Sequence, residues 1–299
     1  MMIRMIMVTI SLGILGVTMG SFAGAQVWRL RARQLQEDKK AGEKVDGKEL
    51  KKLTLLTKKK LTKDRSLCLE CGHELRWYDL LPLVSWLMLR GRCRYCKKFI
   101  GWTELLLEIG LGLLFFLSLM FWLGDIAQPW QVVSLSIWLT GLTLLAILFV
   151  YDLRWQLLPD VINVPFIILG AMFAAVQLSL SSDTTAHAWS LAGSLAILSG
   201  VYALLYLFSY IRYGEERTWV GFGDVKLCLG LALFLGDWLL AFATLFAANF
   251  IGTLLVLPPM LMGKLKANAR IAFGPLLIVG FLVAWFCRQA IFDWCYFFI

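Results

Sequence analysis

The stretch "WQVVSLSIWLTGLTLLAILFVYD" (residues 130–152) decides the class of fold. Residues 130–151 contain no Lys, Arg, Asp or Glu, and the next residue is Asp152. A helix of about 20 apolar residues is long enough to cross the hydrocarbon core of a bilayer. Similar runs recur along the chain, in which 60% of the residues are hydrophobic. The sequence therefore predicts an all-α polytopic membrane protein, because backbone polar groups inside lipid must be satisfied within the helix.

The apolar runs predict about eight transmembrane helices. We expect them at about residues 5–27, 104–123, 130–150, 161–180, 188–210, 224–236, 238–261 and 271–293. The first run is interpreted as a retained helix, because it is long for a signal peptide and arginines follow it. The loops at 124–129 and 181–187 hold no Lys or Arg, and the basic loops all fall on the other side. By the positive-inside rule, Asp152 and Asp224 are then both at cytoplasmic helix ends.

The positive charge of the chain is concentrated in one segment. The formal net charge is +9, and residues 29–65 hold 14 Lys/Arg and 6 Asp/Glu, which gives 14 − 6 = +8. A basic block beside a membrane helix is typical of the cytoplasmic face, so we expect membrane lipid and no nucleic acid as its partner. We divide the chain into a transmembrane helix (1–28), a flexible or partly helical basic arm (29–65), a cysteine module (66–102) and a seven-helix core (103–299).

Four cysteines in the module have the spacing of a metal site. Cys68 and Cys71 form one C-x2-C pair, and Cys93 and Cys96 form another. Two such pairs can direct four thiolates at one tetrahedral Zn²⁺, and a closed set of four ligands is structural rather than catalytic. A cytoplasmic location disfavours the alternative of disulfides. The sequence therefore predicts a structural zinc; four unligated thiols remain the simpler alternative.

Two aspartates are candidates for chemistry at the membrane boundary. Asp152 ends one apolar run, and Asp224 follows Gly221 and Gly223 in "GFGDVKL". Two carboxylates held close together do not both ionise easily, so one keeps its proton while the other acts as a base toward water. The glycines leave room for a substrate strand beside Asp224. This pattern favours an aspartic protease.

Helix capping is the alternative reading for each acid. An Asp at a helix start often caps the helix or complements its dipole, and for Asp160, directly after Pro159, we favour that role. For Asp224 taken alone, capping and catalysis are equally consistent with the sequence. Asp152 ends a helix, where a carboxylate is unfavourable for the dipole, so capping does not explain it. The pairing of Asp152 with Asp224 favours the functional reading.

Four motifs in order resemble the type IV prepilin peptidases, membrane aspartic peptidases of the GxGD type. The motifs are "GSFAGAQVWRL" (20–30), "RSLCLECGHELRWYDLLPLVSWLMLRGRCRYC" (65–96), "YDLRWQLLPD" (151–160) and "GFGDVKL" (221–227). The resemblance implies eight transmembrane helices, Asp152 and Asp224 as the catalytic pair, and the four cysteines as zinc ligands. It also implies cleavage of the leader of type IV prepilins or pseudopilins at the cytoplasmic face of the bacterial inner membrane.

The same resemblance implies a second activity, N-methylation of the new N-terminus with S-adenosylmethionine. Lys226 matches the family's lysine after the second aspartate and would tune the pair or meet an acidic substrate residue, and Glu108 matches a glutamate inside the second helix. Gly24, Leu69 and Arg154 depart from the family pattern, as does the segment 103–105. A non-enzymatic scaffold or transporter, and a methyltransferase that lacks cleavage, are the competing hypotheses.

Overall fold

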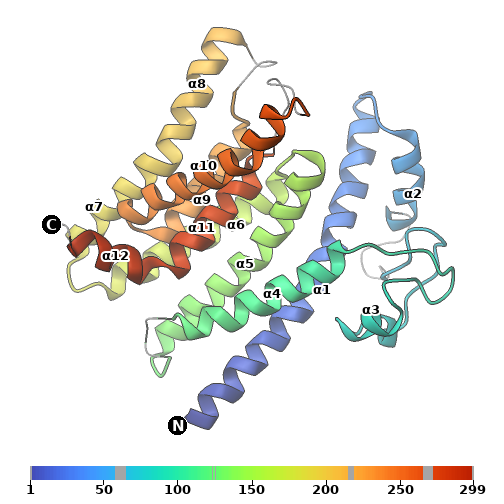
Figure 1. Ribbon diagram of the computed structural model, residues 1–299, viewed down its shortest axis with the longest axis horizontal. Helices are drawn as coiled ribbons and strands as arrows, with labels where there is room; N and C mark the ends of the chain where they lie inside the picture. The colour runs from blue at the N-terminus through green and yellow to red at the C-terminus, as the bar shows by residue number, and fades with distance from the viewer. Residues whose placement is uncertain are drawn as a thin grey trace. The chain divides into compact units, whose positions relative to one another are not determined.

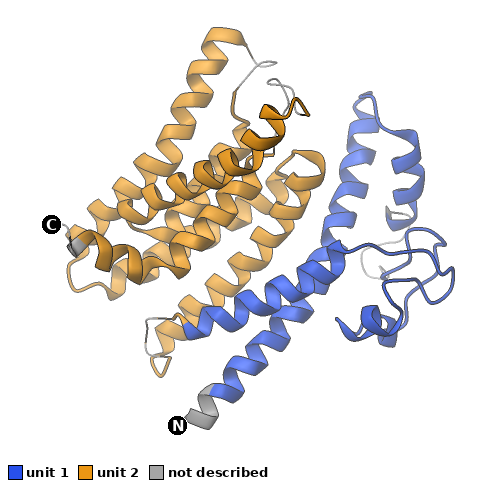
Figure 2. Ribbon diagram, in the orientation of Figure 1, with its two compact units in different colours: residues 1–120 blue, residues 121–299 orange. Residues whose placement is uncertain are grey.

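The chain is helical and divides into two compact units. The computed structural model describes residues 2–57, 65–122, 124, 126–214, 219–264 and 272–297. Over these residues the only pairings of extended chain are two isolated bridges, Leu67 with Glu74 and Arg92 with Phe99. One unit comprises residues 1–120 and the other residues 121–299 (Figure 2). The expectation of an all-α membrane fold is confirmed.

The first unit is built on two long helices. The described elements are α1 (Met2–Lys40), α2 (Gly47–Thr57), the short 3-10 turn η2 (Trp77–Asp79), α3 (Val84–Met88) and α4 (Thr103–Met120). Helices α1 and α4 lie side by side (Figure 1). Their backbones approach so closely that a Cβ on Gly20 would lie 2.5 Å from the Cα of Glu108. Small residues permit this approach in membrane helices, where van der Waals contact drives association.

Helix α1 is longer than the sequence predicts. It continues past residue 27 to Lys40, because the Arg, Gln and Leu residues that follow the apolar run are good helix formers. Its extension packs against α2 through the buried side chains of Ala32, Leu35 and Leu53. The part of the basic arm that the structure describes is thus a helical hairpin, and residues 58–64 of the arm lie outside the described residues.

The second unit is a helical bundle with a short helix among longer ones. Its helices are α5 (Pro129–Trp155), α6 (Asp160–Leu180), α7 (Thr184–Ser194), the π-helical segment η3 (Leu195–Gly200), α8 (Val201–Tyr213), α9 (Phe222–Leu235), α10 (Trp238–Leu261), α11 (Gly274–Phe286) and α12 (Arg288–Phe297). Helix α9 contacts α6, α8, α10, α11 and the α7–η3 segment (Figure 1). As expected from the sequence, α9 is short and ends at Gly236, which has a left-handed conformation.

Six described helices are long and apolar enough to cross a membrane, and a bent pair raises the number to seven. That pair is α11 and α12, which meet at an angle of 69°, so the single helix expected at 271–293 is broken. Helix α9 has 14 residues and falls below the length of a full span, although it lies where a transmembrane helix is predicted. The chain is therefore a multi-pass membrane protein with six or seven membrane-capable helices among the described residues, and α9 occupies the position of a further expected helix without reaching the length of a span.

Candidate active site and metal centre

Asp152 is buried near the end of α5. Its side chain is 4% exposed. The helix ends within a turn of it, where Gln156 adopts a left-handed conformation and donates its backbone N–H to the Asp152 carbonyl at 2.8 Å. An apolar helix of 27 residues thus carries one carboxylate to its terminus. A carboxyl group held inside a membrane helix is costly and commonly marks a functional site.

Gly274, the first residue of α11, lies directly against the Asp152 carboxylate. Its backbone faces the carboxylate as a hydrogen-bond partner. A Cβ on Gly274 would lie 2.6 Å from Oδ2 of Asp152, which is closer than real Cβ atoms approach. No donor among the described residues makes a hydrogen bond of ordinary geometry to Oδ2. Only glycine therefore fits here.

Asp224 is the third residue of α9 and is half-buried. The backbone N–H of Gly221 donates to its Oδ2 at 3.2 Å, so the carboxylate does cap the helix. A full capping box would also need a bond between the side chain of the N-cap residue and the backbone N–H of Asp224. Gly221 is the N-cap residue and has no side chain, so that second bond does not exist. Asp152 is near enough for the two carboxylates to repel each other. The two acids that the sequence analysis paired thus interact electrostatically in the structure, and Asp224 also caps α9.

Asn163 of α6 supports the glycine that precedes Asp224. Its side chain is 0% exposed, and Nδ2 donates to the carbonyl of Gly223 at 3.0 Å. Its Oδ1 has no hydrogen-bond partner among the described residues. Sequence reasoning missed both Asn163 and Gly274. Asn163 could have been noticed as an amide side chain inside an apolar run. Gly274 could have been noticed because, with Pro275, it opens the last apolar run of the chain.

Lys226 is held by Asp160 of α6. Its Nζ lies 2.8 Å and 2.7 Å from the two carboxylate oxygens of Asp160. The same ammonium group lies 4.7 Å from the centre of the Phe222 ring, within the range of a cation–π contact. Asp160 is also in the first turn of α6, as its expected role at a helix start requires. The ion pair fixes the first turn of α9, which carries Asp224, against the start of α6.

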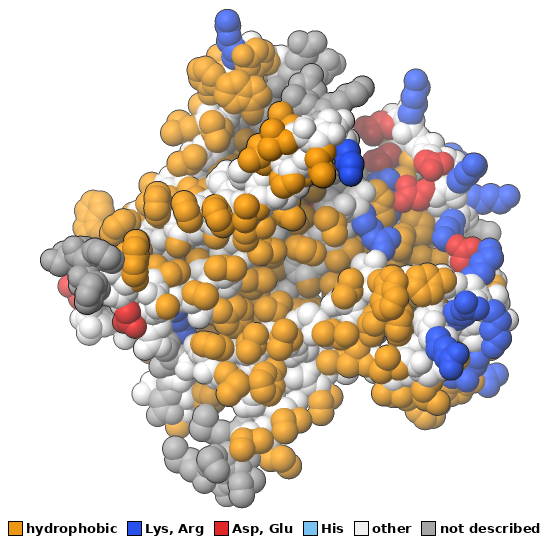
Figure 3. Space-filling view, viewed as in Figure 1, with side chains coloured by type: hydrophobic (Ala, Val, Ile, Leu, Met, Phe, Trp, Pro, Cys, Tyr) orange, Lys and Arg blue, Asp and Glu red, His pale blue; other side chains and the backbone are white. Residues whose placement is uncertain are grey.

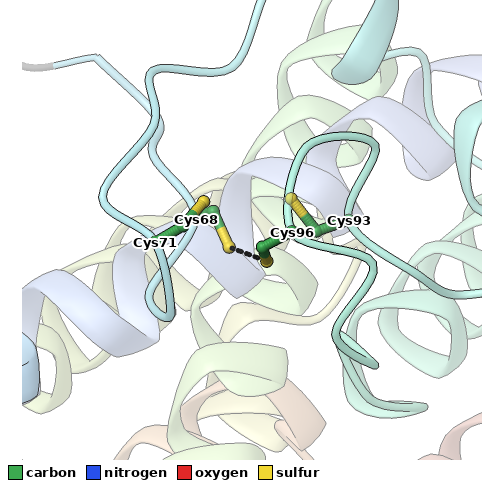
Figure 4. A group of neighbouring side chains, drawn as sticks. All are labelled: Cys68, Cys71, Cys93 and Cys96. Atoms are coloured by element: carbon green, nitrogen blue, oxygen red, sulfur yellow. Dashed lines mark hydrogen bonds between the residues drawn. The ribbon is translucent and has the colours of Figure 1, made fainter.

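The four cysteines of the module converge on one point (Figure 4). The Sγ atoms of Cys68, Cys71, Cys93 and Cys96 all lie within 4.8 Å of one another, and those of Cys68 and Cys96 are 3.9 Å apart. Tetrahedral Zn²⁺ with Zn–S bonds of about 2.3 Å separates its sulfur ligands by roughly 3.8 Å. The donor set and its spacing therefore fit a metal ion with four thiolate ligands.

The two cysteine pairs sit on matching backbone loops. The N–H of Cys68 donates to the carbonyl of His73, and the N–H of Cys93 donates in the same way to Lys98, both at 2.9 Å. Gly72 and Lys97, each following the second cysteine of its pair, both have positive φ, at 70° and 58°. The loops therefore place their cysteines by the same local geometry.

Backbone hydrogen bonds favour the thiolate at Cys93. Burial raises the pKa of this thiol, but hydrogen bonds from the N–H groups of Cys96 and Tyr95, together with those from the thiols of Cys96 and Cys68, hold the pKa below its usual value. Thiolates are the form of cysteine that binds metals. The loop around Cys93 is thus arranged as a metal-binding loop.

Glu70 ties the two loops to the helical arm. Lys52 of α2 and Lys98 of the second loop both form salt bridges with its carboxylate. Hydrogen bonds from these two lysines lower the pKa of Glu70 to about 2. The carboxylate is therefore ionised at neutral pH and connects α2 with both cysteine loops.

Glu108 of α4 anchors the module to the membrane helix. Its side chain is 6% exposed, and Oε2 accepts a hydrogen bond of 2.7 Å from the backbone N–H of Leu83. The hydroxyl of Ser21 in α1 is a second partner. Leu83 has a φ of 58°, which is strained for a leucine. Glu108 therefore holds the chain that leads into α3.

These features define the class of the protein: a multi-pass membrane protein with a four-cysteine module and two carboxylates brought together at helix ends. Two family models match the chain: the bacterial peptidase A24 N-terminal domain over residues 14–122, and the type IV leader peptidase family over residues 139–257. The first range contains all four cysteines and the second contains Asp152 and Asp224. The chain belongs to the type IV leader peptidase family.

Curated relatives match over most of their length. A prepilin leader peptidase/N-methyltransferase of Pseudomonas aeruginosa is 29% identical over 273 residues, which cover 91% of this chain and 87% of the relative. Proteins of the same name are 28% identical in Dichelobacter nodosus, over 90% of this chain and 87% of the relative, and 29% identical in Stutzerimonas stutzeri, over 73% and 70%. No solved structure matches the chain.

Proposed function

We propose that this protein is a membrane aspartic endopeptidase that removes the leader peptide of type IV prepilins or pseudopilins. The observation that carries this function is the meeting of Asp152 and Asp224, which come from the ends of two different helices and interact electrostatically. Family membership and the names of the relatives supply the substrate class.

Hydrolysis requires the two carboxylates to differ in protonation. One is ionised and takes a proton from a water molecule, whose oxygen attacks the scissile carbonyl carbon. The other is protonated and gives its proton to the carbonyl oxygen, so that a neutral diol forms. The diol then collapses as a proton passes to the departing amine, which breaks the C–N bond. Repulsion between Asp152 and Asp224 maintains this unequal state, because it opposes ionisation of both.

The proposed orientation places the active site at the cytoplasmic face of the bacterial inner membrane. The basic segment 29–65, with its charge of 14 − 6 = +8, supports this side for the cysteine module by the positive-inside rule. The alternation of spans then assigns Asp152 and Asp224 to the same side.

The metal of the module is proposed to be a structural Zn²⁺. Cys68, Cys71, Cys93 and Cys96 would hold it, and it would supply folding energy to a module that is too small to build a large core. Four thiolates fill a tetrahedral site, so the ion takes no part in hydrolysis.

Methyl transfer from S-adenosylmethionine is proposed on the names of the relatives alone. The buried Oε2 of Glu104 has no hydrogen-bond partner among the described residues. One such acceptor suits an ammonium group, but it does not define a site for the adenosine. The described side chains thus supply one candidate partner for the ammonium group of the cofactor and do not outline a site for the rest of it.

Mass spectrometry of a co-expressed prepilin tests the proposal. The wild-type protein should yield a pilin without its leader and with one added methyl group, whereas the double variant Asp152→Asn/Asp224→Asn should leave the leader in place. Uncleaved prepilin beside the wild-type protein would overturn the peptidase and favour a scaffold or transporter. Pilin supplied without its leader would still be methylated by the double variant if methyl transfer is a separate activity.

A further inference from the structure

The surface around α3 carries an apolar face outside the membrane helices. Val84, Leu87 and Met88 are spaced i, i+3 and i+4, so they share one side of the helix. All three are exposed, with Leu87 at 62% and Met88 at 76%. Three further large apolar side chains before α3 are also exposed, namely Trp77, Leu80 and Leu81. We call these six residues the α3 face; exposed apolar patches of this kind mark interaction sites.

Arginines flank the α3 face in the sequence. Residues 76–94 contain four arginines and one acidic residue, Asp79. Arg94 pairs with Asp79 at 2.7 Å, which leaves the positive charge of Arg76, Arg90 and Arg92 in excess. Hydrophobic and basic side chains lie beside one another over the module in Figure 3. An apolar face with a basic border has the composition of a surface that lies in the headgroup region of an anionic bilayer.

The hydrogen bond between Leu83 and Glu108 fixes the depth of this face. Helix α4 has 18 residues and is about 27 Å long, so nearly all of it is needed to cross roughly 30 Å of hydrocarbon. Glu108 is five residues into α4, or about 7.5 Å from its start. Leu83 donates to its Oε2 at 2.7 Å and directly precedes α3. The start of α3 therefore lies at the level of the membrane interface.

We propose that the α3 face inserts among the lipid headgroups of an anionic bilayer and that its arginines bind lipid phosphates. The strained φ of Leu83 supports this role, because Glu108 holds the chain in the conformation that brings α3 to the interface. The exposed side chain of Trp102, which directly precedes α4, is typical of the same interfacial level. The cysteine module is thus a peripheral lipid-binding element, and this does not depend on the proposed peptidase activity.

Methyl NMR on the full chain tests the docking directly. The protein is reconstituted in nanodiscs that contain phosphatidylglycerol, with 13C-methyl methionine, and the Met88 signal is assigned through Met88→Leu. Lipid with a doxyl group near its headgroup should remove most of the Met88 intensity, whereas a soluble gadolinium chelate should leave it. Met172, exposed in the middle of α6, serves as the reference for a lipid-facing methyl group.

Two results would overturn the proposal. Loss of the Met88 signal with the chelate but not with the doxyl lipid would mean that the α3 face lies in water. Retention of the signal with both agents would mean that protein covers the face, either another part of this chain, a second copy or a substrate. Leu87→Glu supplies an independent measurement: if the face inserts into lipid, this variant should make Met88 sensitive to the chelate.

Discussion

At the residue scale, Gly274 sets the position of the Asp152 carboxylate. Gly274→Ala should lower the cleavage rate by about 100-fold, because the new methyl group requires the carboxylate or α11 to move by an amount that disturbs catalytic geometry. The measurement is the rate of leader removal by the purified protein. Gly110→Ala is the matched control, since a Cβ at Gly110 meets nothing within 4 Å. Equal rates for both variants would contradict the assigned contact.

Asn163 offers a second test, in which activity and stability should change in different directions. Asn163→Leu keeps a similar shape, removes the donor to Gly223 and also removes a buried oxygen that has no partner among the described residues. An unsatisfied buried group costs about 1–3 kcal/mol, so the thermal midpoint should stay the same or rise. Because the loop before Asp224 loses its support, kcat should fall by about 10- to 100-fold with little change in KM.

The control for Asn163→Leu is Thr244→Val in α10. Thr244 is also completely buried, and its hydroxyl likewise has no partner among the described residues. The thermal midpoint of Thr244→Val should therefore also stay the same or rise, while its kcat stays unchanged. A parallel loss of stability and activity in Asn163→Leu would indicate a purely structural residue.

The acids were predictable from the sequence, but their supports were not. Asp152 and Asp224 stand out because each interrupts an apolar pattern at a helix end, and the topology assigns them to one side. Gly274 and Asn163 belong to other helices, α11 and α6. Their roles depend on how those helices pack against α5 and α9, which periodicity does not encode.

At the scale of elements, the cysteine module should depend on its metal. Cys68→Ser and Cys93→Ser should each lower the zinc bound by the purified protein, and hydrogen exchange should increase over residues 66–100. The reason is that metal binding supplies about 10–16 kcal/mol to small zinc modules at neutral pH. Cys287→Ser is the control, because Cys287 is an exposed thiol outside the cluster. Unchanged zinc content in both ligand variants would contradict the site.

Helix boundaries were predictable where a glycine ends the helix. The end of α9 at Gly236 is one such case. The prediction was poorer for α1, because its apolar run passes into residues that favour the helix equally well, and α2 then covers the extension. The 69° bend between α11 and α12 also escaped prediction, since hydropathy continues across Cys287 while the helix does not.

At the scale of the whole molecule, two units carry separable properties. Residues 1–120 hold the four-cysteine cluster and the α3 face, whereas residues 121–299 hold both aspartates. Loss of zinc should therefore act on the first unit, and loss of an aspartate should leave the first unit folded.

The most direct test of the central claim is leader cleavage by single aspartate variants. The wild-type protein, Asp152→Asn, Asp224→Asn and the control Asp183→Asn, whose acid caps α7, are each co-expressed with a prepilin, and membrane insertion is verified for all four. Mass spectrometry should find intact leader with Asp152→Asn and with Asp224→Asn, since each lacks one group of the pair, and cleaved pilin with the wild type and Asp183→Asn. Normal processing by either Asp152→Asn or Asp224→Asn would contradict the catalytic pair.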